Sequence, residues 1–426
     1  MRRAPALVLA ILCGGVFLPA VAQQADTTRM ALTGGNVLDQ RGATWLTNTT
    51  VLIRGETIEA VYPAGSRALP MGTRMVDVTG RFLIPGLIDT HVHLATVPDS
   101  EDAPPRAAAR LRAALYGGVT SVRDMAGDAR RLAGLARDAQ VGSIESPYIY
   151  YSALFAGPAF FRDPRTLSSS RGAVAGQVPW MRAVTDTTNL PLAVAQAKGT
   201  GATAIKLYAA LDSATVARIT AEAHRQRLLV WSHAALRPAT PAQVVAGGVD
   251  AVSHASLLAT AMSPDEMKTM REDAEAGRPV RVESATLDRV LAAMAARGTV
   301  FDPTLYVYSD NPALQRAMGL LARRARTAGV AVSTGTDSII SQFDGLPNVH
   351  QEMELLVTLA GFSPSAALIA ATRNGARTLG LEDSVGTIAP GRRADLVVLR
   401  ADPLADIRNS RQIDFVVKGG RIYRRP

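Results

Sequence analysis

The middle of the chain alternates short apolar runs with longer stretches rich in Ala, Leu and Arg. The longer stretches repeat apolar positions at helical spacing, as in "PRAAARLRAALYG", "SATVARITAEAHRQR", "TPAQVVAGG" and "TLDRVLAAMAARG". The apolar runs predict strands at "LIDTHVHL", "GVTSVRD", "YIYYSAL", "TAIKLYA", "LLVWSH", "DAVSHAS", "TVFDPTL" and "VAVSTGTD". Eight strands with intervening helices over about 300 residues predict an α/β fold, the (β/α)₈ TIM barrel.

The segments on either side of this region have a different pattern. Residues 30–84 consist of short alternating runs separated by Gly, Asn and Asp, which is typical of β-hairpins. The same pattern returns in "VGTIAPGRRADLVVL" and "DFVVKGGRIYRR". We therefore expect one small β-sandwich domain built from both termini, with residues 23–84 and 385–426 as its parts and the barrel at 85–384.

The first residues predict an export signal. Arg2 and Arg3 precede the apolar run "APALVLAILCGGVFL", and Ala20-Val21-Ala22 supplies small residues for cleavage. A retained membrane anchor is the alternative, but the run is shorter than a full span and Pro19 interrupts its end. We expect residues 1–22 to be a signal peptide and the mature protein to be periplasmic or secreted.

Composition argues against several classes of function. Cys13 is the only cysteine and would leave with the signal, so the mature chain has no disulfide and no thiolate metal ligand. A lipid on Cys13 is disfavoured by the bulky Leu12 before it. The net charge of +9 comes from scattered basic residues without interleaved aromatics, so we expect no nucleic-acid binding. No later segment offers about 20 uninterrupted apolar residues, so stable membrane insertion after cleavage is not expected.

Polar residues that bind metals stand at the ends of the predicted strands. Chemistry in TIM barrels lies at the C-terminal strand ends. His91 and His93 are two positions apart, so both side chains point to one side of a strand and can meet at one ion. Read along the chain, the strand-end residues are His91, His93, Lys206, His233, His254 and Asp337.

Together with "GVTSVRDM", "GATAIKLY", "STGTDS" and the tail "AALIAATRNGARTLGLEDSVGTIAPGRRADLVVL", these residues resemble the amidohydrolase superfamily. The resemblance covers nearly the whole mature chain. It is to the binuclear-metal branch with imidazolonepropionase-like proteins, prolidase-like dipeptidases and ochratoxin-type amidases.

The resemblance implies a role for each strand-end residue. His91 and His93 would hold the more buried of two divalent ions, His233 and His254 would hold the more exposed one, and Zn²⁺ is the metal expected at both. Lys206 would be carboxylated by CO₂ and bridge both ions, because a free ammonium beside two dications would be repelled. Asp337 would touch the buried ion and act as general acid and base for a metal-bridging hydroxide.

Each role has a structural alternative. Lys206 as a plain neutral lysine would indicate a mononuclear site, His233 and His254 can be core histidines, and Asp337 can be a helix N-cap. Of the two other histidines, His224 is expected on the surface.

The expected function is hydrolysis of amide bonds in small molecules. Dipeptides or N-acyl amino acids are the expected substrates. Cyclic amides, lactones or phosphotriesters are the alternative substrates, and an inert barrel that serves as a binding protein is the alternative class. Tyr208 shares a strand face with Lys206, so it is a candidate substrate contact or a barrel-packing residue. His350 is a candidate for substrate contact or for a structural role. Arg123 is a candidate anion contact or an ion-pair partner of Asp124. Association into a homo-oligomer is left open.

Overall fold

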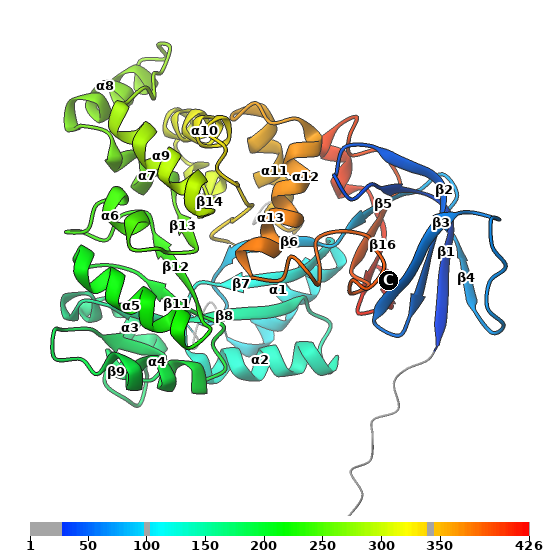
Figure 1. Cartoon of the computed structure of the whole chain (residues 1–426), viewed down its shortest axis with the longest axis horizontal. Helices are drawn as coiled ribbons and strands as arrows, with labels where there is room; N and C mark the ends of the chain where they lie inside the picture. Colours follow the sequence, from blue (N-terminus) through cyan, green and yellow to red (C-terminus); the bar gives the residue numbers. More distant parts are fainter. Residues whose placement is uncertain (1–27, 98–102, 339–344, 426) are drawn as a thin grey trace, which may run out of the picture.

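The computed structural model describes residues 28–97, 103–338 and 345–425. The predicted signal peptide at residues 1–22 lies outside these ranges. The chain forms a parallel barrel with surrounding helices and, beside it, a second sheet that holds the C-terminus (Figure 1). No helix in the described ranges has both the length and the apolar character needed to cross a membrane.

Seven strands build the barrel wall. Each pairs in parallel with the next along the sequence. They are β6 (Leu87–Val92), β7 (Val119–Asp124), β8 (Tyr148–Ala156), β11 (Ala204–Leu207), β12 (Leu229–His233), β13 (Ala251–Ser253) and β14 (Val300–Asp302). Every one was predicted, which confirms the (β/α)₈ class.

The eighth predicted strand, "VAVSTGTD", lies where the last barrel strand is expected. It lacks the regular pairing of a strand. One isolated parallel bridge joins Phe301 to Val332. Backbone bonds then close the barrel, with the Thr90 N–H donating to the Thr334 carbonyl at 2.8 Å. The chain comes so close here that a Cβ at Gly335 would lie 2.8 Å from the Cβ of His91. The segment therefore closes the barrel at the level of the strand-end histidines.

Helices cover the outside of the barrel (Figure 1). The longer ones are α1 (Pro104–Tyr116), α2 (Ala129–Val141), α4 (Leu190–Gly199), α5 (Ser213–Arg225), α8 (Pro264–Glu275), α9 (Ala285–Arg297), α10 (Pro312–Thr327), α11 (Val349–Thr358) and α12 (Pro364–Ala371). The shorter ones are α3 (Pro164–Ser169), α6 (Pro241–Ala246), α7 (Ala255–Leu258) and α13 (Arg373–Thr378), with 3₁₀ turns η1 (Pro158–Arg162), η2 (Ala259–Ala261), η3 (Leu305–Tyr308) and η4 (Ile407–Arg411).

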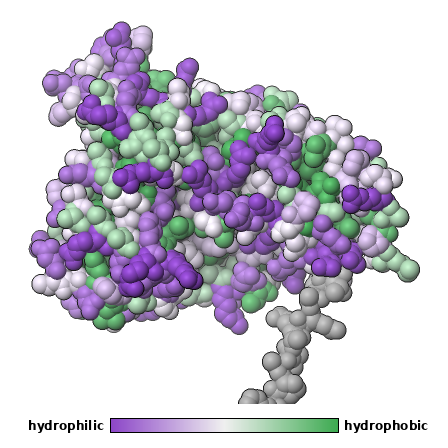
Figure 2. Space-filling view, viewed as in Figure 1, coloured by the Kyte–Doolittle hydropathy of each residue, from purple (hydrophilic) through white to green (hydrophobic). Residues whose placement is uncertain are grey.

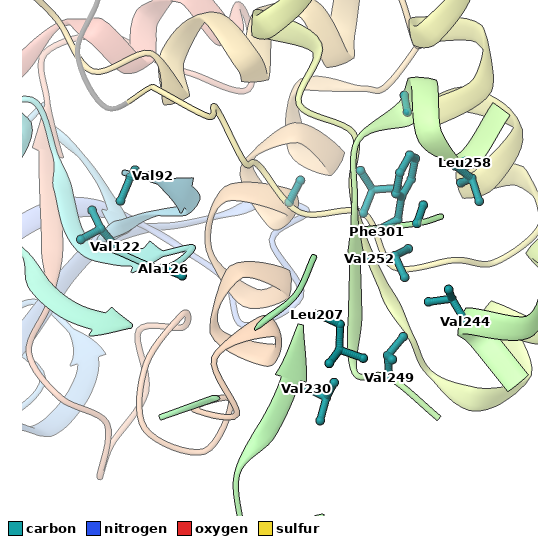
Figure 3. Close-up of a cluster of buried hydrophobic side chains, with 14 of the residues drawn as sticks. Val92, Val122, Ala126, Leu207, Val230, Val244, Val249, Val252, Leu258 and Phe301 are labelled. Atoms are coloured by element: carbon teal, nitrogen blue, oxygen red, sulfur yellow. The ribbon is translucent and has the colours of Figure 1, made fainter. Parts of the chain in front are cut away.

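Strand alternation separates the barrel lining from the core between barrel and helices. Ile205 belongs to the outer cluster. The same cluster contains Leu207, Val230, Val252 and Phe301, which Figure 3 labels. Ala204 belongs to a different cluster, with Trp231 and Val300. Because successive residues point to opposite sides of a strand, Lys206 faces the same way as Ala204, into the barrel.

The second sheet joins both ends of the described chain. Its strand order is β17-β16-β15-β5-β1-β2-β3, with β4 on β1. The strands are β1 (Arg29–Leu38), β2 (Trp45–Arg54), β3 (Thr57–Pro63), β4 (Arg74–Asp77), β5 (Phe82–Pro85), β15 (Leu396–Leu399), β16 (Ile413–Lys418) and β17 (Arg421–Tyr423). Residues Pro85 and Leu396 pair across the junction of the two halves. The expectation of one small β domain from both termini agrees with this sheet.

One element of the fold was not predicted. A short hairpin, β9 (Gln177–Val178) with β10 (Met181–Ala183), pairs with the C-terminal end of β8.

On the face shown in Figure 2, hydrophilic and hydrophobic residues are mixed in small groups over both parts of the molecule. The face therefore has no single large apolar area.

Candidate metal centre

The six predicted ligands line one cavity of about 340 Å³. They come from the C-terminal ends of the three barrel strands β6, β11 and β12, from the residue after β13 and from the segment that closes the barrel. Other residues that line this cavity are Thr96, Val97, Arg110, Met125, Arg165, Tyr208 and Ser338. The strand-end argument therefore located the cavity, and the role of each residue in it stays a prediction.

His91, His93 and Asp337 form the tightest group. Their ligand atoms all lie within 4.8 Å of one another. Oδ1 of Asp337 is 3.0 Å from Nε2 of His93 and 3.4 Å from Nε2 of His91. Burial would raise the pKa of the Asp337 carboxyl, but the charges of His91 and His93 hold it well below its usual range. This set of two imidazoles and a carboxylate fits a divalent metal such as zinc.

His233 and His254 extend the row of imidazoles that begins with His93 and His91. The His254 ring centroid is 4.8 Å from that of His91 and 4.8 Å from that of His233. Burial, with the charge of His91 next, lowers the pKa of His254 to about 3, and burial with the charge of Lys206 lowers the pKa of His233 well below its usual value. Both rings are therefore neutral at pH 7, which is the form that binds metals.

Lys206 is fully buried at the end of β11. Its Nζ has no hydrogen-bond partner in the part of the chain that the structure describes. Burial, with the charge of Arg123 adding to it, lowers the pKa of Lys206 to about 7. An amine without partners and with a low pKa is a nucleophile near neutrality, so Lys206 fits reaction with CO₂ to give a carbamate.

Residues behind the ligands hold them in place. The side chain of Thr304 bonds Nδ1 of His254 at 3.0 Å, and that of Thr96 bonds Nδ1 of His93 at 3.1 Å. Each contact leaves the other ring nitrogen, Nε2, for a ligand in the cavity. Thr304, His254 and Asp337 all have positive φ, a strained backbone for these residue types that often occurs at functional sites.

Two buried aspartates support His91. Asp302 lies 3.5 Å from Nδ1 of His91 and accepts a hydrogen bond from Ser253 at 2.9 Å. Asp89 accepts the backbone N–H of His91 at 3.1 Å and the hydroxyl of Thr336 at 2.6 Å, which ties β6 to the closing segment. Sequence reasoning missed both, because Asp302 lies in the middle of the predicted strand "TVFDPTL" and only the observed strand β14 ends at this residue.

Tyr208 lies on the cavity wall, as the shared strand face predicted. Its ring packs between Phe160 and His233, with centroid distances of 4.4 and 4.1 Å. Its hydroxyl lies 3.4 Å from Nη2 of Arg165. Phe160 and Arg165 belong to the segment after β8, Phe160 to η1 and Arg165 to α3.

The structure corrects the two other candidate substrate contacts. Arg123 is buried below the cavity, where it donates to the Thr90 carbonyl and pairs with Asp302 rather than with Asp124. His350 is also buried, and its ring nitrogens contact Ser410 Oγ and the Gly117 carbonyl, each at 2.8 Å. Neither residue lines the cavity, and each makes polar contacts with internal partners instead.

His224 lies at the surface, as predicted. Its Nε2 contacts Asp250 at 2.9 Å, and 42% of its side chain is exposed. It lies in the last turn of α5 and does not line the cavity. The histidines that line the cavity are therefore the four that stand at strand ends.

The fold and the cavity together define a TIM-barrel enzyme with a candidate metal centre at the C-terminal ends of its strands. The model of the Amidohydrolase family matches residues 82–423. The chain belongs to this family, as its motifs predicted, and it is a hydrolase that acts on carbon–nitrogen bonds.

Similarity to two named proteins supports the assignment to this family. The chain is 29% identical to an imidazolonepropionase of Cereibacter sphaeroides over 396 residues, which cover 84% of this chain and 90% of the relative. It is 25% identical to ochratoxinase of Aspergillus niger over 458 residues, with 96% and 89% covered.

Solved structures agree with the fold. A putative prolidase from Bifidobacterium longum superposes with a TM-score of 0.68 at 25% identity, covering 94% of this chain and 95% of that one. The A. niger ochratoxinase structure superposes with a TM-score of 0.72 at 21% identity, covering 94% and 96%. At such identity the second superposition supports the barrel and the sheet, not a substrate.

Proposed function

We propose that the chain is an exported, binuclear metal-dependent amidohydrolase that cleaves the amide bond of dipeptides or N-acyl amino acids. The observation that carries this proposal is the buried, unpartnered Nζ of Lys206 in a cavity lined by four histidines and one aspartate. A buried amine beside so many metal-binding groups is explained by conversion to a carbamate, whose anion supplies ligands for two ions. Relatives named prolidase and ochratoxinase support the amide substrate.

The residues divide naturally between two ions. His91, His93 and Asp337 would hold the inner ion, His233 and His254 the outer one, and carboxylated Lys206 both. Bound divalent ions such as Zn²⁺ supply Lewis acidity, which activates water and polarises a carbonyl.

The protein itself contributes orientation and proton transfer. Thr304 and Thr96 fix the ring orientations of His254 and His93. Asp337, at 3.0 Å from His93, is the carboxylate that would take a proton from the attacking water and deliver it to the leaving nitrogen. Tyr208 would present its hydroxyl to the substrate from the wall beside His233.

The first test is metal content of the mature chain prepared with bicarbonate, for wild type and Lys206→Ala. We expect about two ions per chain in the wild type and fewer in the variant, together with loss of turnover. Lys268→Ala is the control, because that lysine is exposed and makes only a 3.8 Å contact with Glu272. Labelled bicarbonate should enter the wild type and not Lys206→Ala. One ion in both proteins would contradict the bridge and indicate a mononuclear site.

The second test is a substrate panel of dipeptides, N-acyl amino acids and cyclic amides. Release of amino acids from the first two groups, abolished by a chelator and restored by zinc, is the expected result. The similarity to an imidazolonepropionase is the reason to include cyclic amides. Exclusive turnover of cyclic amides would replace the proposed substrate while keeping the site.

Export is tested separately. The basic start, apolar run and Ala20-Val21-Ala22 of the sequence support cleavage after residue 22. We expect protein made in a bacterial host to be recovered outside the cytoplasm with Gln23 as its first residue. Full-length protein retained in the cytoplasm would contradict this part of the proposal.

A further inference from the structure

Glu352 on α11 is a fully buried carboxylate that does not line the metal cavity. One of its oxygens accepts the backbone N–H of Leu305 at 2.9 Å, and the other accepts the N–H of Tyr306 at 2.8 Å. These two hydrogen bonds join α11 to the turn after the last regular barrel strand. A glutamate is rarely buried so completely without an ion pair, which points to a use for the two bonds.

The two N–H groups belong to a turn with a strained start. Leu305 and Tyr306 begin η3, and Thr304 immediately before them has φ 50° and ψ 50°, in the left-handed region. A β-branched residue is an outlier in that region, so the surrounding contacts must hold it there. Glu352 supplies two of these contacts, and Gln315 adds a third by donating to the Leu305 carbonyl at 3.0 Å.

Thr304 connects this turn to the candidate metal centre. Its hydroxyl lies 3.0 Å from Nδ1 of His254. The main chain of His254 is tied to the same region, because its N–H donates to the Asp302 carbonyl at 3.0 Å. With that backbone fixed, the Thr304 hydroxyl sets how the ring is rotated and which of its nitrogens carries the proton. The contact at Nδ1 leaves Nε2 for an ion in the cavity.

We propose that Glu352 is a positioning residue for the outer metal ion. By holding the N–H groups of Leu305 and Tyr306, it keeps Thr304 in the left-handed conformation, and Thr304 in turn sets the orientation and tautomer of the His254 ring. This rests on the proposed function, because that function assigns His254 to the outer ion. Glu352 itself contacts neither the ion nor the substrate, so its effect passes through Thr304.

The first readout uses the metal-free protein. Wild type and Glu352→Gln carry isotope-labelled histidine, and NMR of the ring nitrogens reports the tautomers, with His254→Asn to identify the His254 signals. We expect His254 of the wild type to carry its proton on Nδ1. In Glu352→Gln an acceptor oxygen becomes an amide donor that cannot accept an N–H, so the turn should loosen and the two tautomers should mix. An unchanged tautomer would overturn the inference.

The second readout is a zinc titration. The wild type should bind two ions, and Glu352→Gln should bind the second about 10- to 100-fold more weakly while the first keeps its affinity. Thr304→Val should show the same selective loss. Because the two residues act along one path, the double variant should be no weaker than the weaker single variant, whereas independent effects would add.

Glu354→Gln is the matched control. It makes the same change on the same helix, but the Glu354 carboxylate pairs with Arg411 at 2.8 Å. Affinity for both ions should equal that of the wild type. If this control lost the second ion as Glu352→Gln does, the effect would belong to the helix as a whole and the inference would fail.

The remaining outcomes separate this inference from the function on which it rests. Losses that add in the double variant would show that Glu352 does not act through Thr304. Equal weakening of both ions would make Glu352 a support of the whole fold, and the inference would fail. One ion in the wild type would contradict the binuclear function, and the tautomer comparison would still decide the role of Glu352.

A second variant covers the case in which Glu352→Gln does not fold. Gln315→Leu loosens the same turn from the Leu305 carbonyl and keeps the buried carboxylate. It should weaken the second ion in the same direction by a smaller factor. Unchanged affinity for the second ion in a folded Gln315→Leu protein would overturn the inference.

Discussion

The buried pair Arg123–Asp302 predicts a large and specific loss of stability when one partner is neutralised. Both side chains are fully buried. The guanidinium lies 4.9 Å from the centre of the Trp231 ring, and its Nε donates to the Thr90 carbonyl. Burial lowers the pKa of Arg123 to about 10, against the opposing charge of Asp302, so the arginine is still charged at pH 7.

The perturbation is Asp302→Asn, which keeps the shape and removes the charge. The guanidinium would then remain buried without its carboxylate. Breaking one side of a buried ion pair costs about 3–5 kcal/mol, and we expect that loss in urea unfolding. Replacing both partners, as in Arg123→Met with Asp302→Asn, removes the uncompensated charge, so the double variant should be more stable than Asp302→Asn.

Zinc affinity should not follow stability in this series. Asp302 faces Nδ1 of His91, and loss of such a carboxylate partner typically lowers metal affinity by about 10- to 100-fold. The double variant should therefore regain stability but not zinc affinity.

The assays are urea unfolding of the metal-free protein and zinc titration. The exposed pair Arg324–Asp288 is the control, because Asp288→Asn should cost less than about 1 kcal/mol. A double variant no more stable than Asp302→Asn would refute the ion-pair argument, and full zinc affinity in that variant would refute the role at His91.

Three further predictions concern single side chains. Thr304→Val removes the hydroxyl that bonds His254, so zinc affinity should fall about 10-fold or more in a titration while the urea midpoint changes little; an unchanged affinity would contradict this role. Glu352→Ala leaves the buried N–H groups of Leu305 and Tyr306 without acceptors and should cost about 2–4 kcal/mol in the same unfolding assay, with a loss below 1 kcal/mol as the contrary result. Burial lowers the pKa of Lys418 to about 8, so between pH 8 and 10.5 the unfolded chain binds more protons than the folded one, and stability relative to Lys418→Met should rise with pH across that window; a flat or falling difference between pH 8 and 9.5 would show that the lysine is not desolvated.

The sequence predicted the ligand cavity because two properties of barrel strands act together. Parallel barrel strands end at the same edge, so residues at strand ends far apart in the chain are brought together. Alternation then decides which of them point inward, and it correctly placed Lys206 and Tyr208 on the inner face of β11 or just beyond it. Both arguments need only local sequence and the fold class.

Depth along the barrel axis and side-chain partners could not be predicted in this way. Arg123 points inward, but it lies one layer below the cavity, where Asp302 from another strand neutralises it. His350 begins a helix near the last strand, yet its ring turns toward Gly117 and Ser410. Such contacts depend on packing between segments that are distant in sequence, which no local pattern contains.

The pairing of β5 with β15 also governs how the chain can fold during its synthesis. The N-terminal strands leave the ribosome long before Leu396, the residue that pairs with Pro85, has been made. Until then β5 has an unpaired edge, which is a hazard for aggregation. Closing a loop of this length also delays the last pairing. All residues of the barrel are therefore synthesised before the second sheet can join its halves, and premature termination near residue 390 leaves the N-terminal half of the sheet without its partner.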